Sequence, residues 1–288
     1  ALYNTVMIYD TIGEYSLAKG LYLKCLANFS IIGVGSPVIN IMSGLGKEIE
    51  VKSYGIGLKN IKFKTSYTGT GRTFIKLNPY RAADEIIYYN INIDNSEFIE
   101  NSISEDFFIE IKTEHINDKS ILSINKNNFI DCKYPFICKG TKSTSILSNG
   151  NKFINSNKNV GETETSMRNY FYLGGDFGNL KFTLNEFENT GIIQYYGHTD
   201  KFLINLNNFK LNYNSNRNLT QNIVEIMDFT TTTAFNQCVF TGNVIEANQI
   251  NATYETSCNF VRSYRDFMYG QISNNTFMSE NYATFASW

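Results

Sequence analysis

The sequence predicts an all-β solenoid, in which short strands and sharp turns coil around one elongated core. A six-residue unit predicts it: one large apolar residue, two variable positions, Asn, one variable position and Phe, as in residues 204–209. The unit recurs at spacings that fit a repeat of about 20–25 residues lengthened by loops, which is the scale of solenoid coils. The flanking segments are rich in Ile, Phe, Tyr and Thr, which favour strands over helices. Each unit is therefore expected to be strand, turn, strand.

The elements follow in chain order from this unit. Further copies lie at 93–98, 124–129, 182–187, 235–240 and 272–277, with looser copies ending at Phe153 and Phe260. Further strands are expected at 74–77, 86–88, 107–111, 121–122, 135–137, 170–173, 192–195, 223–226, 244–246 and 267–269. Two of them precede each of the units that end at Phe98 and Phe129, and one precedes each of the other six units. Insertions at 64–73, 78–85, 155–169 and 212–222 are rich in Asn, Ser, Thr and Gly, which indicates solvated loops.

The Asn and Phe positions of the unit have distinct predicted roles. Asn favours tight turns and can bond neighbouring backbone groups, so stacked coils are expected to stack their Asn side chains into a ladder. The predicted ladder consists of Asn127, Asn151, Asn185, Asn207 and Asn275, with Cys238 and Cys258 replacing two members. The Phe side chains are expected to stack within the core.

This pattern resembles the right-handed parallel β-helix family, which includes pectate lyases, pectin esterases, polygalacturonase-like hydrolases and phage tailspikes. The resemblance implies an opening coil at 1–27, a β-helix at 28–280 and an aromatic C-terminal cap at 281–288. It also implies that the outward face of one sheet can form a carbohydrate cleft. The resemblance is specific for architecture and weak for function, because one fold hosts many activities.

Composition restricts the partners. The net charge is −2, so the chain carries no basic footprint for nucleic acid. No apolar run approaches the roughly 20 residues of a membrane span, and the first residues lack the pattern of a signal peptide. The five Cys include no C-x-x-C pair and there are only two His, so neither a metal nor another cofactor is expected.

The candidate site lies on outward strand positions. Strand alternation places Lys76, Glu110, Gln194, Glu225 and Glu246 outward. Glu225 and Glu246 are expected on adjacent coils, about 5–10 Å apart, a separation that suits glycoside hydrolysis, although outward acids are more often plain solvated charges.

Aromatic residues complete the candidate site, because their faces stack on sugar rings. The predicted substrate-binding residues are Tyr172, Gln194, Tyr196, Glu225 and Glu246, and Glu225 and Glu246 are also the catalytic candidates.

The first functional hypothesis is a virion fibre or tailspike-type attachment protein. Its expected partners are a surface polysaccharide or other glycan, two further copies of the chain in a homotrimer, and other virion proteins. The alternatives are a polysaccharide-degrading hydrolase or lyase, and a bacterial surface adhesin. The expected location is the virion, or else the cell surface or the secreted fraction.

Overall fold

The computed structural model describes nineteen stretches of the chain as follows: 4–11, 13–24, 28–42, 48–65, 73–79, 88–100, 107–112, 119–132, 134–140, 144–154, 169–175, 177–189, 192–196, 199–213, 220–226, 237–249, 257–263, 269–280 and 284–286. All regular structure within them is β-strand.

The strands form three parallel sheets of ten, in which each strand pairs with the strands three before and three after it. Sheet A contains β1 (Asn4–Tyr9), β4 (Asn28–Val34), β7 (Gly55–Lys59), β10 (Tyr88–Asp94), β13 (Lys119–Asn125), β16 (Thr144–Asn149), β19 (Phe177–Thr183), β22 (Thr199–Asn205), β25 (Gln237–Thr241) and β28 (Gly270–Ser273). Sheet B contains β2 (Glu14–Leu17), β5 (Val38–Ile41), β8 (Lys62–Thr65), β11 (Glu97–Glu100), β14 (Asn128–Ile130), β17 (Lys152–Ile154), β20 (Glu186–Glu188), β23 (Asn208–Tyr213), β26 (Val244–Gln249) and β29 (Thr276–Glu280). Sheet C contains β3 (Leu21–Lys24), β6 (Ile49–Ser53), β9 (Thr73–Pro79), β12 (Phe107–Lys112), β15 (Tyr134–Gly140), β18 (Asn169–Gly175), β21 (Ile192–Tyr196), β24 (Thr220–Ile226), β27 (Ser257–Ser263) and β30 (Thr284–Ala286).

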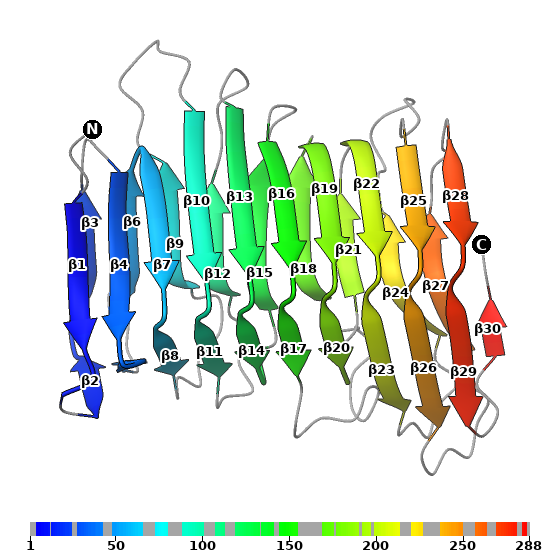
Figure 1. The fold of residues 1–288 in the computed structure, drawn as a ribbon, viewed down its shortest axis with the longest axis horizontal. Coiled ribbons are helices and arrows are strands. Elements are labelled where there is room, and N and C mark those ends of the chain that lie inside the picture. Colours follow the sequence, from blue (N-terminus) through cyan, green and yellow to red (C-terminus); the bar gives the residue numbers. More distant parts are fainter. Residues whose placement is uncertain are drawn as a thin grey trace.

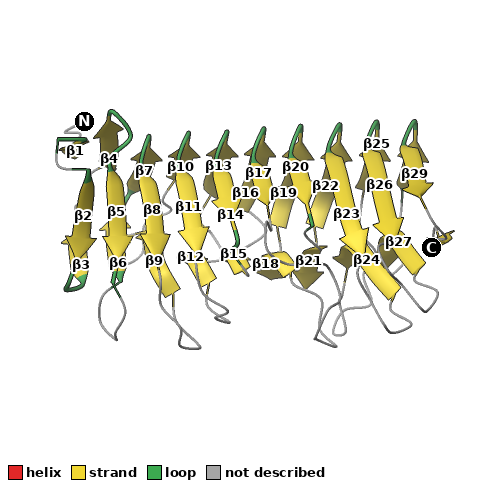
Figure 2. Ribbon diagram, turned by 90° about the horizontal axis from the view of Figure 1, so that it is seen from below, coloured by secondary structure: helices red, strands yellow, loops and turns green. Residues whose placement is uncertain are grey.

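Successive coils stack along one axis, with the first coil, β1 to β3, at one end and the last, β28 to β30, at the other (Figures 1 and 2). Inward side chains from all three sheets meet in one continuous core. The architecture is a right-handed parallel β-helix, which confirms the predicted fold class.

A column of phenylalanine rings runs through this core, one ring from each of the six consecutive sheet B strands β8, β11, β14, β17, β20 and β23. Centroid distances are 5.5 Å for Phe63–Phe98, 4.8 Å for Phe98–Phe129, 5.0 Å for Phe129–Phe153, 4.9 Å for Phe153–Phe187 and 4.6 Å for Phe187–Phe209. The interplanar angles lie between 8° and 17°, so the rings are stacked nearly parallel. The predicted Phe stack is confirmed for these coils.

The asparagine ladder occupies the corner between sheets A and B. The backbone N–H and Nδ2 of Asn127 donate to Oδ1 of Asn151, at 2.9 and 3.0 Å. Nδ2 of Asn127 also donates to the carbonyl of Ile93 in the preceding coil, at 2.8 Å. The same pattern continues through Asn185 and Asn207, so each ladder amide satisfies backbone groups that are out of reach of water.

The ladder differs from the prediction at one coil. Its member between Asn207 and Asn275 is Asn243, which accepts from Asn207 and donates to Asn275. Cys238 is not a member, because it lies inside β25, in register with Phe202. Cys258 lies in β27 of sheet C, so the two cysteines do not stack.

The prediction misplaced this unit because the true unit ends on Ile instead of Phe, so the Asn–Phe pattern does not reveal it. In this coil the unit is 240–245, and Ile245 takes the place of Phe in register with Phe209. The apparent unit at 235–240 ended on Phe240, which is instead the large apolar residue that opens the true one.

The sharp turn itself is also one position earlier than expected. Left-handed backbone occurs at the residue before the ladder position, as at Asn60 (φ 56°), Asn95 (φ 47°) and Gly242 (φ 66°). The ladder residue itself supplies the buried side chain. Two separate residues therefore make the corner, one for the backbone and one for the hydrogen bonds.

Gly33 on β4 is required by close approach of the next coil. A Cβ on this residue would lie 2.0 Å from the backbone oxygen of Asn60 and 2.6 Å from Cδ of Pro37. We expect Gly33→Ala to lower the free energy of unfolding by about 1–3 kcal/mol, as overpacking does. Urea unfolding measures it, with Ser30→Ala on the same strand as the control expected within about 0.5 kcal/mol of wild type. Equal midpoints for both variants would contradict the packing described here.

The buried thiol of Cys238 allows the packing of the core to be tested by chemical alkylation. Burial raises the pKa of its thiol from 9.0 to about 12, so the reactive thiolate is absent near neutral pH. We expect iodoacetamide at pH 8 to leave Cys238 unmodified in the folded protein and to modify it after unfolding in guanidinium. Peptide mass spectrometry locates the label, and rapid labelling of Cys238 in the folded protein would refute its burial.

Candidate functional site

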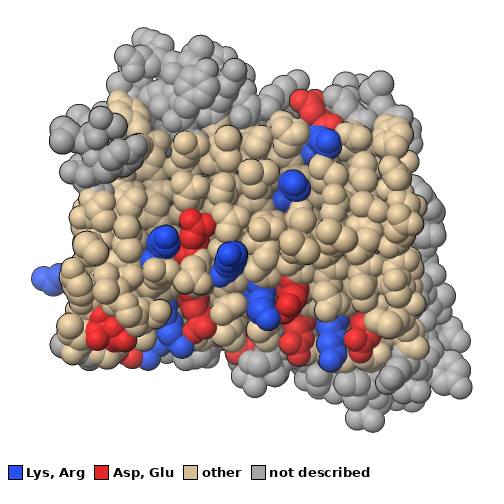
Figure 3. Space-filling view, in the orientation of Figure 1, with Lys and Arg blue, Asp and Glu red and all other residues tan. Residues whose placement is uncertain are grey.

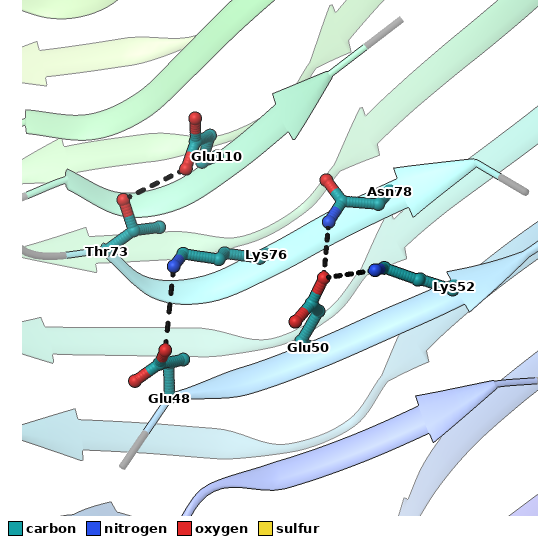
Figure 4. Close-up of polar contacts among 7 residues, drawn as sticks. All are labelled: Glu48, Glu50, Lys52, Thr73, Lys76, Asn78 and Glu110. Carbon is teal, nitrogen blue, oxygen red and sulfur yellow. Dashed lines mark hydrogen bonds and ion pairs between the residues drawn. The ribbon is translucent and has the colours of Figure 1, made fainter. Parts of the chain in front are cut away.

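The outer face of sheet C carries a connected set of polar side chains on β6, β9 and β12 (Figure 4). Glu50 accepts a hydrogen bond from Nδ2 of Asn78 at 2.8 Å and pairs with Nζ of Lys52 at 3.2 Å. Nζ of Lys76 lies 3.6 Å from Glu48. These contacts hold carboxylate, amide and ammonium groups in fixed positions on two consecutive coils, those of β6 and β9.

Glu110 extends this set by one coil. Its Oε2 accepts a hydrogen bond from the Thr73 hydroxyl at 3.2 Å. Glu50, Lys76 and Glu110 are all only partly buried, so their polar atoms remain within reach of a ligand. The charges largely compensate one another, which favours an uncharged polar ligand over a polyanion or polycation.

The strand register continues this face along the solenoid. One column of sheet C contains nine residues, each aligned with the next: Tyr22, Glu50, Lys76, Glu110, Ile137, Tyr172, Gln194, Glu225 and Arg262. Neighbouring positions are separated by the strand spacing of about 4.8 Å. Eight of these nine positions are polar or aromatic, and the ninth, Ile137 on β15, is aliphatic and buried.

The register brings together most of the residues predicted for the site. Tyr172, Gln194 and Glu225 align consecutively in this column, on β18, β21 and β24. Tyr196 lies two residues along β21 from Gln194, in register with Gly174. For these four residues the structure describes the strand position and not the side chain. The adjacent loop segments 155–168 and 214–219 lie outside the described residues.

Glu246 is the exception, and the expected pairing of Glu225 with Glu246 is wrong. Glu246 lies on β26 of sheet B, in register with Lys210 and Met278, whereas Glu225 lies on β24 of sheet C. Its Oε1 accepts a hydrogen bond from Nδ2 of Asn248 at 2.7 Å. Because 240–245 is the true repeat unit, the strand that follows it belongs to sheet B. The two carboxylates are therefore not neighbours on adjacent coils of one sheet.

Sequence reasoning missed the N-terminal part of the site, namely Glu48, Glu50, Lys52 and Asn78. The signal was present in residues 49–53, where Ile49, Val51 and Ser53 are buried and alternate with Glu50 and Lys52. Such alternation marks one core face and one solvent face of a strand.

Other kinds of site receive no support from the described residues. They include no group of three or more His, Cys, Asp or Glu arranged to hold a metal ion. Across the same residues, no helix is long and apolar enough to cross a membrane. Comparison of the chain with protein-family models, with curated proteins and with solved structures finds no match.

Proposed function

We propose that this protein is a virion attachment protein of the fibre or tailspike type, which binds surface glycan through the outer face of sheet C. In this proposal the β-helix is a rigid rod and copies of it assemble, as a trimer, together with other virion proteins. The observation that carries the proposal is the alignment of polar or aromatic residues at eight of the nine positions of the sheet C column from β3 to β27.

The column suits an extended polymer of sugar units for three reasons. Its interval of about 4.8 Å is close to the length of one sugar unit in an extended chain. Carboxylate and amide groups accept and donate hydrogen bonds to hydroxyls. Tyrosine, at two positions of the column, supplies a flat apolar face for a sugar ring together with a hydroxyl.

Binding is favoured over cleavage. The hydrolase alternative rested on Glu225 and Glu246 as a catalytic pair, and these residues lie in different sheets. Within the column, Glu50 and Glu110 are separated by the coil of Lys76, and their carboxylates are already bonded to Asn78 and Thr73. The proposed role of this face is therefore to hold glycan rather than to break it.

A panel of immobilised polysaccharides tests the proposal. We expect wild-type protein to bind at least one of them, and the variant Tyr172→Ala/Gln194→Ala/Glu225→Ala to bind it at least about tenfold more weakly, a loss of 1.4 kcal/mol. The matched control is Asn208→Ala/Lys210→Ala/Glu246→Ala on sheet B, expected to bind within about twofold of wild type. If the sheet B variant lost polysaccharide binding and the sheet C variant kept it, the binding face would be sheet B and not sheet C.

The same panel separates binding from cleavage. Reducing ends or unsaturated products released by wild-type protein would show an enzyme, and Glu225→Gln and Glu110→Gln would then identify the acid involved. We expect no release.

A further inference from the structure

Two adjacent turns between sheets A and B carry exposed leucines. Leu184 and Leu206 both have left-handed backbone, with φ of 56° and 55°. Their exposed fractions are 55% and 56%. A leucine in this conformation is strained because its Cβ crowds the backbone. An exposed leucine side chain stays in water, so it contributes little hydrophobic free energy to offset that strain.

The equivalent turns of most other coils use residues that suit this backbone, and Lys126 (φ 54°) is the exception. Asn60, Asn95 and Asn274 are asparagines, and Gly150 and Gly242 are glycines. The next coil makes room for Leu206, because a Cβ on Gly242 would lie 2.7 Å from Cδ2 of Leu206. Leu184 and Leu206 thus form an apolar ridge, which we call the leucine ridge, at the corner between sheets A and B.

The leucine ridge borders a broad face that is poor in charge. Outward positions in the middle of sheet A align as Ser30, Gly57, Asn92, Ser123, Leu147, Lys181, Leu203, Val239 and Gln271. Figure 3 shows few charged side chains over this face, and most of the Lys, Arg, Asp and Glu side chains lie below it, toward sheet B. Ile121 adds an aliphatic side chain that is 47% exposed.

The size of this face matches a stable interface between proteins. Ten strands at about 4.8 Å and strand lengths of about 17–20 Å give an area on the order of 800 Å². A standard interface buries about 800 Å² on each partner. The coils also repeat at one interval, so side chains of a second sheet with the same interval can fit between those of the first along its whole length.

We infer that the outer face of sheet A, together with the leucine ridge, is the surface on which a second copy of this chain docks. We assign a second copy as the partner because it brings the same coil interval and a face that is equally poor in charge. Docking would bury Leu184 and Leu206, and the association would then offset the strain of their backbone. The inference rests on the proposed assembly of copies and not on the proposed binding of glycan.

The decisive variant is Leu184→Asn/Leu206→Asn. Asparagine is the native residue at this turn in three other coils, so the variant is expected to fold and to melt at the same or a higher temperature when diluted to monomer. Self-association is expected to weaken at least about tenfold, which is 1.4 kcal/mol. Sedimentation velocity over a range of concentrations measures it against the monomer mass of 32.8 kDa.

Two further variants keep the test decisive. Met42→Asn/Met278→Asn removes two comparably exposed apolar side chains from sheet B and its border, and it is expected to associate like wild type. Asn92→Lys/Ile121→Lys places charge on the flat part of sheet A, at exposed positions, and is expected to dissociate the assembly.

The outcomes separate the claims. A wild-type protein that stays monomeric at high concentration overturns both the assembly and this surface. Undiminished association of the leucine and lysine variants overturns the surface alone. Loss of polysaccharide binding in these variants without a change in mass would assign sheet A to glycan instead and also overturn the inference.

Discussion

Phe129→Ala is expected to lower the free energy of unfolding by about 3–5 kcal/mol, the largest effect of any single substitution proposed for this chain. The Phe129 side chain is fully buried and stacks on two rings, Phe98 at 4.8 Å and Phe153 at 5.0 Å. Removal leaves a cavity that neighbouring coils cannot close, because each is fixed by hydrogen bonds to the coils on both sides. Urea unfolding followed by circular dichroism measures the loss.

Phe277→Ala is the matched control. Phe277 belongs to the same register column but lies in the last coil and is 41% exposed. Its truncation is expected to cost less than about 1 kcal/mol. Similar losses at Phe129 and Phe277 would mean that the stability of the solenoid does not depend on the stacked interior.

Asn151→Ala is expected to cost about 2–4 kcal/mol, because buried polar groups left without partners cost roughly 1–3 kcal/mol each. The Asn151 side chain accepts from the backbone N–H of Asn127 at 2.9 Å and donates to the carbonyl of Ile124 at 2.7 Å. Both backbone groups lie in the interior of the ladder, where water does not replace the amide. Thermal and urea unfolding measure the change.

Asn151→Ser tests whether hydrogen bonding is the cause. Ser96 occupies the ladder position of an earlier coil, where its hydroxyl accepts from the N–H of Ile61 and donates to the carbonyl of Asp94. Serine is therefore expected to recover part of the stability that alanine loses. If serine is no better than alanine at position 151, the ladder contributes through packing rather than through hydrogen bonds.

The repeating core was predictable because each of its roles demands a particular side chain. The ladder position needs a short side chain that both donates and accepts, and Asn127, Asn151, Asn185 and Asn207 show it directly in the sequence. The inward Phe two positions later fixed the register of the sheet B strands. The prediction was wrong where the chemistry is interchangeable, as at Ile245, since any large apolar residue fills that place.

The site was less predictable than the core. Outward positions on a strand accept almost any polar residue, so the sequence indicates that Glu225 and Glu246 face solvent but not which sheet each belongs to. Because the turn at Asn243 was not recognised, Glu246 was expected beside Glu225, whereas it lies in sheet B. The strained backbone of Leu184 and Leu206 carries no sequence signal, because a leucine before a ladder Asn looks like an ordinary apolar residue.

The most direct test of the proposed function is how affinity depends on glycan length. A series of oligosaccharides cut from a polysaccharide that binds is titrated by calorimetry into wild-type protein and into Tyr172→Ala/Gln194→Ala/Glu225→Ala. An extended site of aligned positions along sheet C predicts that affinity rises steadily with the number of sugar units and that the variant loses most of this rise. Affinity that is complete with one or two sugar units, or that rises equally in the variant, would contradict the assignment of the sheet C column as the glycan-binding face.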